Sequence, residues 1–311
     1  MKFTVDANHD GVLLRSYLKG TCAVSARLLI RLKQTDGGIC VNGVPSTVRK
    51  ILHTGDEVEI ACGETPAGSL FAPEDTRVRI LFEDGDVLAV SKPPFMPTHT
   101  SVRHYEGTLA NALTGMFRER GEAFVFRPVN RLDRNTSGIV LLGKNQYSAS
   151  LLCRAMKRHE ISKTYYALTD GFLPEPSGRM DGWIRRRTEG IVIREICGQN
   201  DPGAEEVRLS YEVIVSSLAG ADEPHSFVRL MPETGRTHQL RVQLASAGCP
   251  VTGDGLYGQD SVRIPRQALH AGVLKWKHPV TGETVVTEDP LPDDFRACCR
   301  ALFPDFDFSK F

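Results

Sequence analysis

Short apolar runs joined by tight turns recur along this chain of 311 residues, and they restrict its fold strongly. The run RVRILFEDGDVLAVSKPP (77–94) places Asp84-Gly85 between two apolar stretches, as in a β-hairpin. The run WIRRRTEGIVIREI (183–196) repeats this pattern around Gly190, and apolar residues alternate strictly over 207–215. Neighbouring strands of this kind predict a mixed, mostly antiparallel sheet.

Helical patterns are interspersed with these strands. Apolar residues recur at helical spacing over 145–159 and over 237–248. A sheet built from hairpins with a few helices between them is typical of the α+β class. We therefore expect an α+β catalytic domain with flanking helices over 77–311, preceded by a Gly- and Pro-rich linker at 63–76.

Residues 1–62 form a compositional unit of their own, which we expect to fold as a small α/β module. A short helix should end at Gly20, and Ser25 is a suitable N-cap for a second helix. Asn42-Gly43 is a strong signal for a tight turn, and a short alternating strand follows it.

The second helix of this unit carries a basic face. An apolar stripe of leucines occupies one side, and Arg27, Arg31 and Lys33 lie largely on the other. A charged helix face is often merely solvated, so this pattern alone favours no partner. Across the whole chain 38 Lys+Arg balance 38 Asp+Glu, so a surface for nucleic acid has to be a local patch.

The chain has the character of a cytoplasmic protein. It contains no apolar run of about 18 residues, so we expect no membrane span. Asp6 and Asp10 interrupt the place where a signal peptide needs an apolar core. The eight cysteines form no C-x-x-C pair, which is typical of reduced thiols rather than of a zinc or redox motif.

Four loops bear basic side chains beside apolar elements, and they predict a site for an anionic ligand. These loops are 91–101, 130–138, 233–244 and 266–283. In the second, Asp133 lies between Arg131 and Arg134. In the third, Arg236 and Arg241 could bind phosphate or orient a carboxylate.

The chemistry expected at this site is that of a carboxylate. Zinc-protease, dinucleotide, Walker and nucleophile-elbow motifs are all missing, so neither a metal nor a cofactor is implied. Arginine neighbours favour the ionised form of Asp133, which could then act as a nucleophile or as a base. A plainer alternative is that Asp133 only caps a turn.

The sequence resembles the RluA-type family of RNA pseudouridine synthases, and five blocks in the family's order carry that resemblance. NRLDRNTSGIVLLGK resembles the block that holds the catalytic aspartate, which implies Asp133. SKTYYAL resembles the block of the active-site tyrosine, which implies Tyr165. TGRTHQLRVQL implies Arg236 as the arginine that pairs with the aspartate. SKPPFMPTHTS and LHAGVLKWKHPVTGE resemble the remaining two blocks.

The resemblance implies isomerisation of uridine to pseudouridine in structured RNA without a cofactor. It further implies RNA contacts by Lys92, Arg131, Arg134 and Arg241 in the catalytic domain. Residues 1–62 similarly resemble the small RNA-binding module named after a ribosomal protein, the S-four module, which favours RNA contacts by its basic helix face.

The sequence departs from the family pattern at two positions, and it leaves the substrate open. Asn130 replaces the usual histidine of the aspartate block, and Phe95 replaces a usual glycine. We expect ribosomal large-subunit RNA as the substrate, with transfer RNA as the alternative. The oligomeric state is not indicated.

Two functions from other classes are the alternatives to this one. A non-catalytic RNA-binding protein could lose Asp133 or Arg236, and both are present. A glycoside hydrolase would need a second carboxylate at a set distance, for which Glu106, Glu233 and Glu283 are the candidates.

Overall fold

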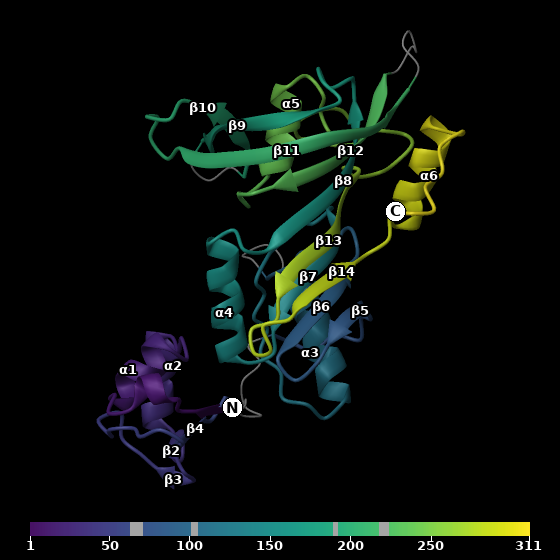
Figure 1. Cartoon of the computed structure of the whole chain (residues 1–311). Coiled ribbons are helices and arrows are strands. Elements are labelled where there is room, and N and C mark those ends of the chain that lie inside the picture. The colour runs from purple at the N-terminus through teal and green to yellow at the C-terminus, as the bar shows by residue number, and fades with distance from the viewer. Residues whose placement is uncertain (63–70, 101–104, 189–191, 218–223) are drawn as a thin grey trace.

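The computed structural model describes residues 1–62, 71–100, 105–188, 192–217 and 224–311. Its largest element is a ten-stranded sheet (Figure 1). In spatial order its strands are β10 (Arg194–Cys197), β9 (Ser177–Arg186), β11 (Glu205–Ser216), β12 (His225–Pro232), β8 (Ser162–Asp170), β13 (Leu269–Lys277), β7 (Ser137–Gly143), β6 (Val87–Lys92) and β5 (Arg79–Glu83), while β14 (Thr284–Glu288) pairs with β13.

The pairing of these strands confirms a mixed, mostly antiparallel sheet. Among the described strands, the parallel pair is β7 with β13, where His270 lies opposite Ser137 and Ala271 opposite Gly138. Gly138 has φ +118°, and a Cβ there would lie 2.3 Å from the Ala271 oxygen. Only glycine therefore allows the two backbones to approach at this point.

Four helices accompany the large sheet in the described part of the chain. They are α3 (Leu109–Glu119), α4 (Gln146–Lys157), α5 (Gln239–Ser246) and α6 (Asp293–Leu302). α4 and α5 lie within the two predicted helical patterns, and Asn145 Oδ1 caps α4 by accepting from Ser148 N at 2.9 Å. Within the described residues, no helix combines the length and the apolar character that spanning a bilayer requires.

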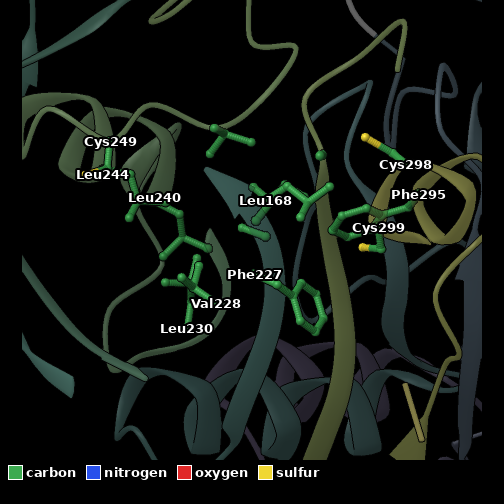
Figure 2. Packing of buried hydrophobic residues seen from close by; sticks show 14 of the residues in the cluster. Leu168, Phe227, Val228, Leu230, Leu240, Leu244, Cys249, Phe295, Cys298 and Cys299 are labelled. Atoms are coloured by element: carbon green, nitrogen blue, oxygen red, sulfur yellow. The ribbon is translucent and has the colours of Figure 1, made fainter. Parts of the chain in front are cut away.

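The main core lies on both faces of strands β8 and β12. Val228 and Leu230 lie near Leu240 and Leu244 of α5, whereas Phe227 lies toward α6 on the other side (Figure 2). This division follows from the strand period, because successive side chains point to opposite faces. α5 and α6 thus cover opposite faces of the same two strands, and this packing sets the position of α5.

Residues 1–62 form a separate four-stranded sheet with its own helices. Its strands run in the order β1 (Lys2–Thr4), β4 (Glu57–Ile60), β2 (Ile39–Val41) and β3 (Val44–Pro45), and its helices are η1 (Ala7–His9), α1 (Leu14–Gly20) and α2 (Ala26–Gln34). The Ser25 hydroxyl accepts from Leu28 N at 3.2 Å, which confirms the predicted cap. Asn42 and Gly43, both with positive φ, form the predicted turn.

This N-terminal unit contacts the large domain through α4, beside which it lies in Figure 1. The Tyr147 hydroxyl donates to the Cys22 oxygen at 2.7 Å. The Phe3 ring meets the edge of the Tyr147 ring with centroids 5.9 Å apart. Of the features predicted from sequence, Gly190, Ser101 and residues 63–70 of the linker lie outside the described residues.

Candidate active site

Asp133 lies in the loop that leads into β7. The Asp133 backbone oxygen accepts from Thr136 N at 3.1 Å and so closes the turn. The side chain, with 21% of its surface exposed, instead contacts Arg241 and lines a pocket. Because the backbone closes the turn, turn capping does not account for the carboxylate of Asp133.

Residues on either side of Asp133 hold its loop in place. The Thr98 hydroxyl donates to Leu132 O at 2.9 Å and accepts from Leu132 N at 3.2 Å. The Asn130 amide donates to Ile139 O at 3.0 Å and accepts from Leu141 N at 2.8 Å. The side chain of Asn130 therefore binds the backbone of β7, and it lines the adjoining cavity beside Tyr165 rather than the pocket of Asp133 itself.

Lys92 holds the same loop in place through hydrogen bonds to its backbone. Its side chain is fully buried and donates to the backbone oxygens of Pro93 (2.9 Å), Met96 (2.7 Å) and Arg134 (3.2 Å). Burial lowers the pKa of Lys92 to about 7, against the opposing effect of the Asp133 charge. The expected contact of Lys92 with RNA is wrong, because this side chain has no surface to offer a phosphate.

Arg241, on α5, joins two carboxylates. Its Nε and Nη2 atoms lie 2.6 and 2.7 Å from the two carboxylate oxygens of Asp254. Its Nη1 atom lies 3.1 Å from Asp133 Oδ2. The bidentate bond to Asp254 fixes the plane of the guanidinium, so that the remaining edge points at Asp133. Arg241 is 6% exposed, which also rules out the expected contact with phosphate.

The structure corrects the partner that the resemblance assigned to Asp133. Arg236 Nη1 lies 3.1 Å from Glu205 Oε1, and the side chain is 44% exposed. Arg236 precedes α5, and its backbone N–H donates to Gln239 Oε1 at 3.1 Å in the loop before the helix. Arg241 lies within α5, which packs against the core, and is therefore the arginine that reaches Asp133.

His238 is a second polar neighbour of Asp133. It has φ +57°, a conformation that few residues with a Cβ adopt, and it immediately precedes α5. The Tyr257 hydroxyl accepts from Arg194 N at 2.7 Å, and its oxygen lies 2.9 Å from His238 Nδ1. Nε2 of the same ring lies 3.8 Å from Asp133 Oδ2. Burial lowers the pKa of His238, which favours the neutral ring.

Tyr165 and Lys163, both from β8, line the pocket with Asp133. Desolvation raises the pKa of Tyr165, and the charge of Asp133 adds to the effect, so the phenol stays protonated. Lys163 donates to Thr234 O at 3.0 Å, and burial lowers its pKa to about 8. Lys163 and His238 lie in the sequence blocks quoted above, whereas Asp254 lies outside them. Nothing in the sequence distinguished these three residues as site residues.

The other expected RNA contacts lie at the surface. Arg131 and Arg134 are exposed on the loop of Asp133, and Arg131 lines the pocket. On α2, Arg27 and Lys33 are exposed and Arg31 is half-buried. Their contacts with RNA stay predictions.

Comparison with known proteins supports a single family. The family profile described as RNA pseudouridylate synthase matches residues 86–246. The RNA pseudouridine synthase YhcT of Bacillus subtilis is 35% identical over 97% of both chains. Ribosomal large subunit pseudouridine synthase D of Nitrosomonas europaea is 31% identical over 85% of this chain and 76% of its own.

A solved structure agrees with these relatives. Human RNA Pseudouridylate Synthase Domain Containing 1 superposes with a TM-score of 0.56 at 30% identity, over 71% of this chain and 87% of the human chain. Profile, relatives and fold converge, and the chain belongs to the RNA pseudouridine synthase family of enzymes.

Proposed function

We propose that Asp133 isomerises uridine to pseudouridine within RNA and that the reaction needs no cofactor. The observation that carries this proposal is the contact of a partly exposed carboxylate with Arg241, in a pocket that also holds Tyr165. The ion pair with Arg241 holds the carboxylate in place, while its exposed part remains open to a nucleotide. Isomerisation oxidises nothing and releases no group, so its stoichiometry calls for no further reagent.

The proposed reaction breaks one bond to the ribose and forms another. The bond from uracil N1 to ribose C1′ breaks, the base rotates, and C5 bonds to C1′. The C5 proton is lost and N1 gains a proton, so the atoms balance. Asp133 acts on the ribose as a nucleophile or as a base. Tyr165, kept protonated, packs its ring on the detached uracil and offers a hydrogen bond.

The proposed substrate is structured RNA, with ribosomal large-subunit RNA favoured. Support comes from relatives named as large-subunit pseudouridine synthases, such as that of Nitrosomonas europaea. A uridine in a stem has to leave the stack, at a cost of a few kcal/mol that positive loops on the flanking phosphates can offset. Transfer RNA is the alternative, and mapping pseudouridine in both RNAs with and without the gene distinguishes the two.

The N-terminal unit is proposed to bind RNA as an S-four module does. Its small sheet, its α-helices α1 and α2, and the exposed Arg27 and Lys33 of α2 support this assignment. It would add affinity for RNA and leave the chemistry to the larger domain.

The glycoside hydrolase alternative finds no suitable second carboxylate among the three residues singled out for it. Glu106 is exposed and is not among the described residues that line the pocket. Glu233 Oε1 lies 2.9 Å from Arg179 Nη2, at the surface. The Glu283 backbone N–H donates to the Thr281 hydroxyl at 3.3 Å, and its exposed side chain is not among the described residues that line the pocket. Asp254, which shares Arg241 with Asp133, is 1% exposed and binds the guanidinium with both oxygens.

The substitution Asp133→Asn tests the proposed function. An amide keeps the shape but cannot act as a nucleophile or as a base, so pseudouridine formation should become undetectable. RNA binding should change little or improve slightly, because a negative charge beside the phosphates is removed. Both quantities are measured on one folded preparation, by titration with RNA and by chemical mapping of pseudouridine.

Asp201→Asn is the matched control. The Asp201 carboxylate caps a turn by accepting from Gly198 N at 2.9 Å, and an Asn can do the same. This variant should keep full activity. Sizeable turnover by Asp133→Asn would show that another group performs the chemistry.

A further inference from the structure

Phe95 combines two features that are rarely found together. Its φ is +65°, in the left-handed region that is a genuine outlier for a bulky side chain. The same side chain is 47% exposed, so its apolar ring covers no core that could compensate for the strained backbone. Strained residues of this kind cluster at functional sites.

The surrounding loop holds Phe95 in this conformation. Lys92, fully buried, donates to the oxygens of Pro93 and Met96 on either side of it. Arg134 Nε donates to the Phe95 oxygen at 3.2 Å. The backbone oxygens of the loop are thus bound to side chains, while the Phe95 ring is left at the surface.

Phe95 lies beside the catalytic loop but outside the pocket. Its partner Arg134 follows Asp133 directly, and Lys92 also binds the Arg134 oxygen at 3.2 Å. Among the described residues, those that line the pocket of Asp133 do not include Phe95. The ring is therefore placed to meet a neighbour of the target nucleotide rather than the target itself.

We propose that Phe95 is a stacking platform for the nucleobase next to the target uridine. An exposed ring beside the exposed Arg134, whose Nε donates to the Phe95 oxygen, has the character of a surface that binds unpaired nucleic acid. The arginine meets a phosphate and the ring meets the face of a base. This inference rests on the proposed function, since it assumes that RNA enters the pocket of Asp133.

The test compares Phe95→Gly and Phe95→Ala in a chain that also carries Asp133→Asn, so that no turnover occurs. The probe is a short single-stranded RNA with one uridine flanked by 2-aminopurine, whose fluorescence falls on stacking. Loss of the ring should weaken binding by roughly 5- to 150-fold, the range for one base stacked on an aromatic side chain. Phe95→Trp should keep both the affinity and the quenching.

Two controls separate stacking from a structural role. Phe95→Gly should raise the midpoint of thermal unfolding, because glycine adopts this φ without strain, whereas a ring needed for the fold would lower it. Phe172→Ala should leave binding unchanged. Phe172 is 41% exposed, follows the end of β8, and has no left-handed backbone.

An RNA that lacks the two flanking bases completes the test. On this RNA the loss caused by Phe95→Ala should disappear, because no base remains to stack. Equal affinity of the parent and the Phe95→Ala chain for the intact probe would overturn the platform, as would a loss that persists without the bases. Pseudouridine formation by the wild-type chain is scored separately, so a failure of the platform can be told apart from a failure of the proposed function.

Discussion

The arginine that binds Asp133 in the pocket is buried, whereas the basic side chains of the N-terminal unit are mostly exposed to solvent. Arg241 is buried and binds two carboxylates, so its position is fixed before any substrate arrives. Arg27 and Lys33 of α2 are exposed to solvent. A fixed, desolvated charge suits the stabilisation of a reacting group, whereas a solvated charge suits a phosphate backbone whose position varies. We therefore expect the same residue type to serve two purposes in one chain.

The largest expected effect separates Arg241 from Arg236. Arg241→Lys keeps the charge but loses the fork that binds Asp254 and Asp133 together, so turnover should fall about 100-fold. Arg236→Lys, at an exposed pair with Glu205, should change turnover by less than about threefold. Single-turnover rates at saturating RNA measure both, with thermal unfolding as the check on folding. Equal losses of turnover in the two variants would mean that the burial of Arg241 does not make it more important for turnover than Arg236.

The second prediction concerns pH and the buried Lys92. Between pH 7 and the ordinary lysine pKa of 10.5, the unfolded chain holds a proton that the folded chain has lost. Stability rises with pH where the unfolded state binds more protons, so Lys92 should contribute a rise of up to about 1.4 kcal/mol per pH unit in the free energy of unfolding.

Lys92→Met removes this titration. Urea unfolding from pH 7 to 10 should give a flatter pH dependence for the variant than for the wild type, whatever the change in absolute stability. Parallel curves would show that the folded protein keeps the Lys92 proton throughout this range.

The smallest expected effect belongs to the N-terminal unit. Replacing Arg27, Arg31 and Lys33 by Gln should make the salt dependence of RNA binding shallower, by about 0.7–0.9 in slope for each phosphate that the variant leaves unbound. Single-turnover rates at saturating RNA should change little. Arg300→Gln, at the exposed end of α6, is the control. An unchanged slope in the triple variant would show that the basic face of α2 is merely solvated.

Local patterns predicted the elements well, because each one depends on neighbours in the sequence. Asn42-Gly43 and Asp84-Gly85 join strands as expected, and Ser25 caps its helix as expected. The helix α3 was not predicted, although Thr108 and Asn111 form a capping box that was available as a signal.

The partner of Asp133 could not be predicted from local patterns. Arg236 and Arg241 lie in one segment, and spacing alone left both able to orient a carboxylate. The choice depends on how α5 packs against β12 and on the burial of Asp254, which are tertiary facts. Lys92 is a similar case. Two of its three carbonyl partners are close in sequence, but the third belongs to Arg134. Local sequence patterns therefore do not reveal that this lysine, a residue type usually exposed, is buried.

The parallel pairing of β7 with β13 has a consequence for synthesis. The loop of Asp133 ends at Ser137, and the strand that pairs beside it begins at Leu269. During translation, more than a hundred residues therefore leave the ribosome after Asp133 before its loop gains that neighbour. Contacts so distant in sequence also slow folding, because the chain loses the entropy of loop closure before these contacts stabilise it. The nascent chain thus acquires the geometry of the pocket late, whereas every strand of the N-terminal sheet has been synthesised once Ile60 is made.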